Sequence, residues 1–187
     1  MKKRILVAMS GGVDSSTAAA ILKTEGHEIT GITMKLMDKA AGKAGLLSCC
    51  GFGPADDARA VAEMLGFRHV VADATKLFRS GVIQAFVDEY RAGRTPNPCI
   101  LCNTHLKFDF LLGKAAEMGM DCLATGHYAR INDSRLYRGA DADKDQSYFL
   151  YTLNPGNLGR VLFPLGGMRK SETRALAKKF GFKDRGR

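Results

Sequence analysis

The sequence predicts an α/β protein: a parallel sheet with helices on both faces, followed by a short hairpin and a helical extension. Short apolar runs rich in β-branched residues alternate with segments of helical composition, glycines or prolines mark most junctions, and no internal repeat interrupts the pattern. Strands that alternate with helices form parallel sheets, because each connecting helix returns the chain to the same edge. The pattern leaves the strand order open.

In the first part of the chain, apolar runs and helix stops define the elements. The run at 4–9 ends in a Gly-rich segment, and the helix after it closes at Gly26, the residue type that most often ends a helix. Pro54 falls in the first turn of the next helix, where a missing N–H is no loss. The predicted elements are strand 4–9, helix 15–26, strand 27–36, helix 53–66 and strand 68–73.

The second part adds helices, one more strand and a hairpin that turns at Asp133 and Ser134. The last helix begins with a capping-box pattern from Ser171 to Arg174. We expect a boundary near residue 140, which divides the chain into a catalytic domain, 1–140, and the start of an extension, 141–187. The predicted elements are helix 80–91, loop 93–103, helix 105–118, strand 121–126, hairpin 129–139 and helix 170–181.

Charge and cysteine content narrow the function classes. The 187 residues carry 28 Lys and Arg against 19 Asp and Glu, a formal net charge of +9, which favours a polyanionic partner such as nucleic acid. Five cysteines, an odd number, argue against a disulfide framework and for metal, redox or nucleophilic use. The N-terminal apolar run is too short for a secretion signal or a membrane span, so we expect a cytoplasmic location and no membrane partner.

The string SGGVDSS at residues 10–16 predicts a phosphate site. Gly11 and Gly12 let backbone amides approach an anion, the serines add hydroxyl donors, and the following helix N-terminus contributes a favourable dipole. The string is neither a Walker motif nor the GxGxxG fingerprint.

The string GRTPNPCILCN at 93–103 predicts a rigid loop that presents Cys99 and Cys102. Pro96 and Pro98 fix the backbone there, so the loop is expected to be extended or turned, with no room for a helix. Two cysteines at this spacing suit a shared metal or a redox pair. Half of a zinc site and direct persulfide chemistry remain alternatives.

SGGVDSS resembles the pyrophosphate loop of the ATP pyrophosphatases, enzymes of adenine nucleotide alpha hydrolase-like fold that split ATP between the α and β phosphates. The resemblance implies ATP and Mg²⁺ as ligands, with Met34 against adenine and Gly126 at the nucleotide. Met34 as an ordinary core residue is the alternative. The residues implied in ATP binding are Ala8, Met9, Ser10, Gly11, Gly12, Val13, Asp14, Ser15, Met34 and Gly126.

Three further strings, GRTPNPCILCNTHLKF (93–108), ATGHYAR (124–130) and KDQSYFL (144–150), resemble those of the tRNA-specific 2-thiouridylases in the same order. The resemblance implies that O2 of a wobble uridine in tRNA is adenylated and that sulfur, from a persulfide carrier or sulfide, displaces AMP. Catalysis would fall to Cys102 and Cys99, although many members carry Asp at the position of Cys99. The residues implied in tRNA contact are Asn97, Pro98, Cys99, Lys144, Asp145 and Gln146.

Related cluster-dependent thiolases imply a [4Fe-4S] cluster on Cys99, Cys102 and a third cysteine. Cys49 and Cys50 are candidates for a role at the site, whereas Cys122 lies in a predicted strand and is expected in the core. The family's second cysteine falls beyond the last helix, and the sequence ends at Arg187 before one appears, so we expect a fragment or a substitute cysteine.

His127 is as consistent with a structural histidine as with a catalytic one. Basic residues at the start of helix 105–118, His105 and Lys107, do not suit a helix N-terminus and so are candidates to contact phosphate. Two other functions stay open: a small-molecule synthetase with the same ATP loop, and a truncated relative that binds tRNA or carries sulfur without turnover.

Overall fold

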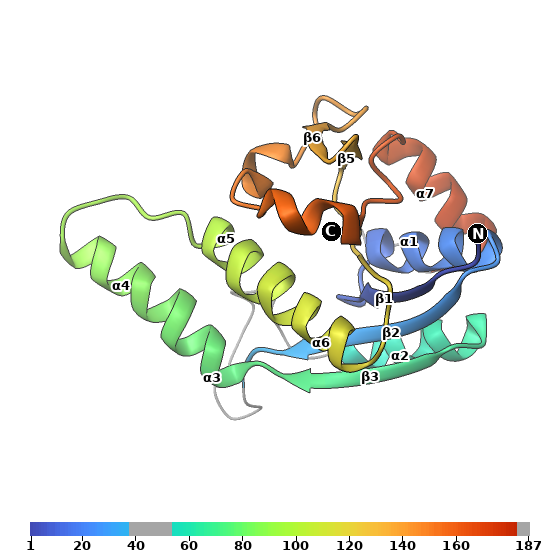
Figure 1. Ribbon diagram of the computed structural model, residues 1–187, viewed down its shortest axis with the longest axis horizontal. Helices are drawn as coiled ribbons and strands as arrows, with labels where there is room; N and C mark the ends of the chain where they lie inside the picture. Colours follow the sequence, from blue (N-terminus) through green and yellow to red (C-terminus); the bar gives the residue numbers. More distant parts are fainter. Residues whose placement is uncertain (38–53, 183–187) are drawn as a thin grey trace.

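The computed structural model describes residues 1–37 and 54–182, which form a five-stranded parallel sheet, its helices and a separate two-stranded hairpin (Figure 1). The strand order is β3-β2-β1-β4-β7, and every pairing is parallel. The carboxyl ends of the strands therefore meet at one edge, where loops bring distant segments together. The strands are β1 (Arg4–Ala8), β2 (Glu28–Lys35), β3 (Arg68–Asp73), β4 (Cys122–Ala124) and β7 (Val161–Leu162).

Helices cover both faces of the sheet, as the sequence predicted. Ile5 and Val7 of β1 face a cluster that includes α1 (Val13–Thr24) and α2 (Pro54–Leu65), whereas Leu6 packs with the helices on the other face. All three β1 side chains are fully buried. Apolar residues at consecutive positions are needed because a central parallel strand is covered on both sides.

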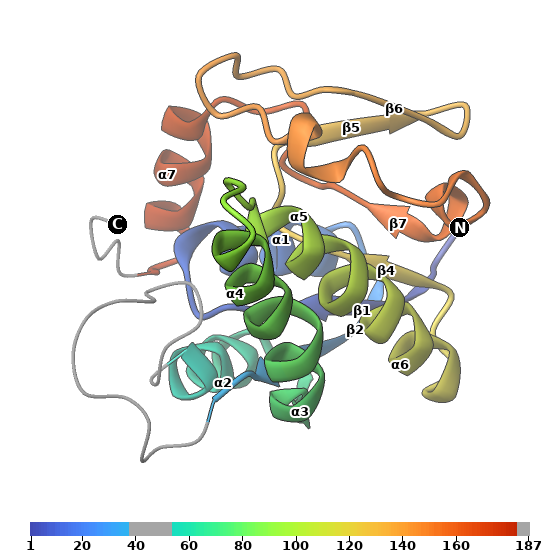
Figure 2. The same cartoon turned by 90° about the vertical axis from the view of Figure 1, so that its left-hand side faces the viewer.

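Two long helical stretches lie side by side, and the second of them packs on the second face of the sheet (Figure 2). Each is continuous through a π-helical middle segment. The first begins at Thr75, earlier than the sequence predicted, and consists of α3 (Thr75–Phe78), η2 (Arg79–Ile83) and α4 (Gln84–Arg91). The second consists of α5 (Pro98–Leu101), η3 (Cys102–Phe110) and α6 (Leu111–Glu117).

The second stretch corrects the prediction of a rigid loop at 93–103. Pro98 occupies the first helical position, where proline is favoured, and the Asn97 side chain caps the helix by accepting a hydrogen bond from the Cys99 N–H at 3.2 Å. Cys99 and Cys102 therefore lie on a helix. His105 and Lys107 lie in its middle rather than at a start, and His105 faces Asp109 at 3.4 Å.

The last part of the chain begins with hairpin strands β5 (Ala129–Asn132) and β6 (Arg135–Arg138). Asp133 and Ser134 turn with φ of 46° and 55°, which confirms the predicted turn. Two 3-10 turns follow, η4 (Ser147–Leu150) and η5 (Pro155–Arg160).

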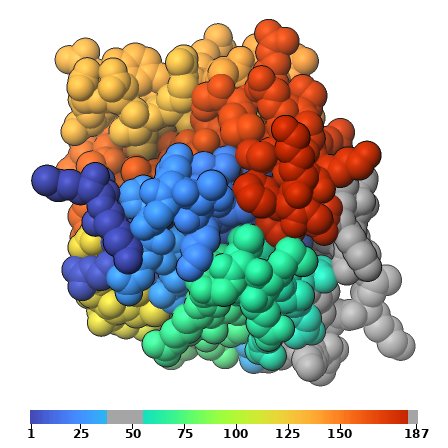
Figure 3. Space-filling view, turned by 90° about the vertical axis from the view of Figure 1, so that its right-hand side faces the viewer, coloured from blue at the N-terminus to red at the C-terminus, as the bar shows by residue number. Residues whose placement is uncertain are grey.

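The final helix, α7 (Lys170–Lys179), lies beside α1 (Figure 3). Its capping contact differs from the predicted Ser171–Arg174 pattern: the N-cap is Arg169, and the Glu172 carboxylate accepts a hydrogen bond from the Arg169 N–H at 2.6 Å. Residues beyond 140 thus supply strand β7 of the sheet and helix α7, which packs on α1, so they belong to the same fold as the residues before 140. None of the helices among the described residues is both long and apolar enough to span a bilayer.

Candidate functional site

The loop between β1 and α1 is held by its own hydrogen bonds. Gly11 has a φ of 68°, a left-handed conformation that glycine adopts without strain, and Gly12 caps α1 in an extended conformation. Ser15 Oγ accepts from the Ser10 N–H at 3.1 Å and donates to the Gly12 carbonyl at 3.1 Å. The Ser16 hydroxyl, also predicted as a donor to phosphate, is buried and instead donates to the same carbonyl at 3.0 Å.

The geometry of this loop suits an anion. The first N–H groups of α1, from Val13 to Ser15, point out of the helix end and have no acceptor within the helix. The helix dipole adds partial positive charge at the same place. Ala8 and Met9 place no side chain at the loop, because the Ala8 side chain packs against the core and Met9 is buried, with its N–H donated to the Ile32 carbonyl at 2.8 Å. The loop itself therefore offers a ring of backbone donors at the carboxyl edge of the sheet.

Asp14, the one acid in the loop, is engaged by two groups that are distant in sequence. The Lys170 ammonium, from the first residue of α7, lies 2.6 and 2.7 Å from the two carboxylate oxygens. The Tyr128 hydroxyl donates to Oδ1 at 2.9 Å, and the Lys170 ammonium also lies 5.6 Å from the centre of the Tyr128 ring. Burial raises the pKa of Tyr128, so its hydroxyl stays protonated and remains a donor.

No sequence motif singles out Lys170, which belongs to a helix that carries several other cations. The two sides of the pair are 156 positions apart, and the contact forms because α7 packs on α1. The side chains of Lys170 and Asp14 are 17% and 33% exposed, so the pair is shielded yet open on one side. An ammonium held there offsets the negative charge of Asp14 beside the backbone donors of the loop, which the loop alone cannot do.

Gly126 lies where the end of β4 passes the start of α1. A Cβ at this position would come within 2.9 Å of the Ser15 nitrogen and 3.0 Å of the Asp14 carbonyl carbon. No side chain fits against those backbone atoms without a shift of the loop. The structure thus brings Gly126 to the loop to which the sequence assigned it.

Cys102 also lies near the carboxyl edge. It is half-buried and packs against a cluster that contains Leu36, directly after β2, and Phe78. Met34 packs against both this cluster and the main core, as a core residue does. Its side chain is only partly buried, so part of it remains open to a ligand. The cluster that contacts Cys102 and the β1–α1 loop therefore lie at the carboxyl ends of two neighbouring strands, β2 and β1.

Cys99 is exposed, one helical turn before Cys102. Residues three apart on a helix share a face, so the two sulfurs are neighbours. Among residues 1–37 and 54–182 there is no group of three or more His, Cys, Asp or Glu side chains arranged to hold a metal ion. Cys49 and Cys50 lie outside the described residues. Cys122 is buried in the core, as predicted.

The three residues of the string KDQ lie after the hairpin. Lys144 is exposed. The Asp145 carboxylate accepts from the Gly139 N–H at 2.8 Å and from the Ser147 hydroxyl at 2.8 Å. Gln146 Oε1 accepts from the Tyr128 N–H at 3.0 Å. Two of the three thus hold the local backbone, and the segment is tied to the residue that contacts Asp14.

His127 is buried between the rings of Phe108 and Phe163, and its Nδ1 lies 2.7 Å from Thr125 Oγ1. Burial, with a smaller contribution from Lys107, holds its pKa well below the ordinary value. The ring is therefore neutral in the native state, which fits a structural histidine that packs under the site.

This burial predicts acid sensitivity. Below about pH 6.5 the unfolded chain binds a proton that native His127 does not, so the free energy of unfolding falls by up to about 1.4 kcal/mol per pH unit. We expect His127→Gln to reduce the loss measured by urea titration between about pH 7 and about pH 5.5. His69, whose pKa burial also lowers, contributes equally to both proteins. Equal acid sensitivity of variant and parent would contradict the assignment.

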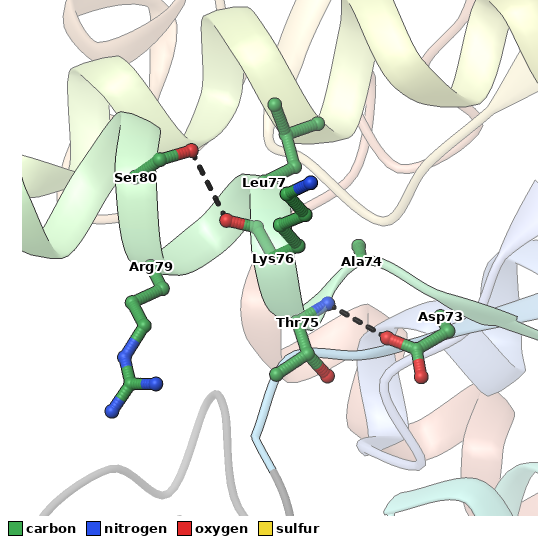
Figure 4. Close-up of a pocket in the computed structure, with 7 residues that line it drawn as sticks. All are labelled: Asp73, Ala74, Thr75, Lys76, Leu77, Arg79 and Ser80. Carbon is green, nitrogen blue, oxygen red and sulfur yellow. Dashed lines mark hydrogen bonds between the residues drawn. The ribbon is translucent and has the colours of Figure 1, made fainter.

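A surface hollow lies directly after β3, at the start of α3 (Figure 4). The Asp73 carboxylate accepts from the Thr75 N–H at 2.9 Å, which lowers the pKa of that acid and gives the first N–H of α3 an acceptor. Arg79 extends its side chain at the rim. None of the residues that the sequence assigned to ATP or RNA lines this hollow.

Comparison with known proteins gives a consistent picture. A family described as tRNA methyl transferase HUP domain matches residues 3–187. A tRNA-specific 2-thiouridylase of Geobacter metallireducens is 53% identical over 97% of this chain and 52% of its own length, and one of Magnetococcus marinus is 50% identical over 96% and 52%. The chain therefore spans about half the length of the curated relatives it matches.

Solved structures share the fold. A 4-thiouridine synthetase in complex with RNA and ATP has a TM-score of 0.67 at 20% identity, over 96% of this chain and 41% of that one. An NMN synthetase from Francisella tularensis has a TM-score of 0.52 at 16% identity, over 97% and 63%. The expected fold class, a parallel sheet of the pyrophosphate-loop type with helices on both faces, is confirmed.

Proposed function

Because this chain belongs to the tRNA methyl transferase HUP domain family, we propose that it carries the ATP site and the sulfur site of a tRNA-uridine 2-sulfurtransferase. One observation carries the proposal: an anion-binding loop with an ammonium at its side and a cysteine pair lie at the same edge of one sheet. The names of its relatives, tRNA-specific 2-thiouridylases, support the same activity. A cytoplasmic location accompanies it.

In the activation step, the backbone N–H groups from Gly11 to Ser15 hold the β and γ phosphates of ATP. The uridine O2 attacks the α phosphorus, pyrophosphate leaves, and C2 of the base becomes electrophilic. The Lys170 ammonium stabilises the negative charge that develops on the leaving pyrophosphate. Met34 and Gly126 border the nucleotide.

Asp14 is the acid that would hold Mg²⁺, which neutralises phosphate charge when bound. The residues fit this role, because the carboxylate lies at the loop and is partly exposed. The contact of the Lys170 ammonium with this carboxylate supports its attraction for a cation.

In the sulfur step, Cys99 and Cys102 act as a pair. A persulfide carrier transfers its outer sulfur to one thiolate, and that sulfur attacks C2 as AMP leaves with the former O2. The second thiolate then attacks the inner sulfur, which leaves the outer sulfur on C2 and forms a disulfide between the cysteines. A thiol reductant of the cell restores the pair. A [4Fe-4S] cluster on these cysteines would need a further ligand, and residues 1–37 and 54–182 supply no group of three, so no step is drawn through it.

The RNA contacts in this proposal surround the same helix. Asn97 and Pro98 precede Cys99 directly and border the target base, and Lys144 to Gln146 contact the tRNA beside it. The net charge of +9 supports binding to a phosphate backbone.

Product analysis tests the function. The chain is incubated with ATP, Mg²⁺, a tRNA transcript, a persulfide donor and a thiol reductant, and nucleotides and digested RNA are separated by chromatography. We expect AMP and pyrophosphate, formed only when the tRNA is present, together with 2-thiouridine. The relative from Geobacter metallireducens serves as the reference. ADP as product would refute pyrophosphate cleavage, AMP formed with a small acceptor instead of RNA would indicate a small-molecule synthetase, and RNA binding with no AMP would indicate a non-catalytic relative.

A further inference from the structure

We propose that Tyr148 and Tyr151 form a stacking surface for unpaired bases next to the target uridine; this inference rests on the proposed function. Their side chains are 66% and 65% exposed, an unusual state for large aromatic residues of a folded protein. The two ring centres lie 6.2 Å apart. Exposed aromatic rings are the feature on which proteins stack bases of single-stranded RNA.

The surface is held rigidly. Between the two tyrosines, Leu150 is fully buried in the core, and Phe149 packs edge-on against Tyr148 with ring centres 5.5 Å apart. The backbone carbonyl of Phe149 accepts a hydrogen bond from the Asn103 side chain at 3.1 Å. Thr152 Oγ1 lies 2.5 Å from Thr104 Oγ1. Rings fixed in this way lose little conformational freedom when a base stacks on them.

The surface lies beside the cysteine helix. Asn103 and Thr104 belong to η3, which continues the helix that carries Cys99 and Cys102, and η4 packs against α5 as well as η3. A base that stacks on Tyr148 or Tyr151 therefore belongs to the same RNA segment that reaches Cys99.

Charge on the neighbouring hairpin favours RNA over an apolar protein partner. Strand β6 packs against η4, and the hairpin carries three exposed arginines: Arg130, Arg135 and Arg138. The side chain of Arg138 is 88% exposed although it lies 3.7 Å from Asp145. Aromatic rings bordered by arginines match an unpaired strand, which offers base faces and phosphates together.

Binding to a defined RNA tests the inference. The probes are an RNA stem–loop whose unpaired loop contains uridine next to 2-aminopurine, and a duplex of the same stem without a loop. We expect Tyr148→Leu with Tyr151→Leu to weaken stem–loop binding about 5- to 100-fold and to abolish the 2-aminopurine fluorescence change. Duplex binding and its salt dependence should not change, because the phosphate contacts remain.

Two controls separate stacking from other effects. Tyr90→Leu removes an equally exposed tyrosine, 68%, from α4, and should bind as the parent does. Tyr148→Phe with Tyr151→Phe keeps the rings and should restore binding and the fluorescence change. A leucine double variant that binds the stem–loop as the parent does would overturn the stacking surface while leaving the proposed function intact, and so would a phenylalanine variant that fails to rescue. A parent protein with no affinity for the stem–loop would overturn the proposed function and this inference with it.

Discussion

Replacing Lys170 by methionine is expected to slow RNA-dependent pyrophosphate release by about 100- to 1000-fold, the usual cost of losing one preorganised charge at a transition state. Its ammonium lies 2.6 Å from Asp14, beside the backbone donors of the loop, and approaches from α7 rather than from the loop itself. Without it, the loop keeps its shape but the Asp14 carboxylate repels the phosphates. The measurement is the initial rate of pyrophosphate release with saturating tRNA.

Matched variants isolate the charge. Lys170→Arg retains a cation and should recover part of the rate, whereas Lys178→Met removes an exposed lysine from the same helix and should leave the rate unchanged. Stem–loop binding should be unaffected in all three, since the proposed RNA contacts lie at the hairpin, at residues 144–151 and at the cysteine helix. A Lys170→Met protein that releases pyrophosphate within about twofold of the parent would remove Lys170 from the activation step.

Local signals predicted most of the sheet and its helices. The run at 4–9 forms β1, and Gly26, with a φ of 84°, ends the turn after α1 as its type suggests. These elements agree with the sequence because burial on both faces demands uninterrupted apolar residues, and because helix ends depend on nearby residues. The phosphate-type loop between β1 and α1 could be predicted for the same reason, because its glycines and serines form hydrogen bonds with one another within a few positions.

Three features could not be predicted from the sequence: the helix at Pro98, the Lys170–Asp14 pair and the exposed tyrosines. They depend on contacts between distant residues, or on a local sequence that is compatible with two structures. Pro98 is compatible with an extended loop and with the first turn of a helix; the packing of Leu106 and Leu111 in the core selects the helix. Lys170 approaches Asp14 only through the packing of α7 on α1, so no motif near either residue reveals the pair. The exposed state of Tyr148 and Tyr151 likewise follows from the burial of Leu150 between them.

Removal of either thiol at the start of the cysteine helix is expected to stop thiolation. Cys99→Ser and Cys102→Ser should each lower 2-thiouridine formation from a persulfide donor by on the order of 1000-fold or more, as loss of a catalytic nucleophile does. RNA-dependent pyrophosphate release should continue in both variants, because the β1–α1 loop and Lys170 are unchanged. Cys122→Ala, a core cysteine that is 3% exposed, serves as the control: it should lose some stability and keep its activity.

The pattern of the two variants distinguishes the sulfur routes. Both thiols are needed if one carries the persulfide and the other releases it, and their spacing on one helical face permits the disulfide that closes the cycle. A Cys99→Ser protein with full activity from the persulfide donor would leave Cys102 as the sole carrier and would require an external thiol to release the sulfur. Iron and acid-labile sulfide in anaerobically purified parent protein, lost in both variants, would favour a cluster completed by a ligand outside residues 1–37 and 54–182. Full activity in both variants would make the cysteine helix structural, and the assignment of thiolation to this chain would then be wrong.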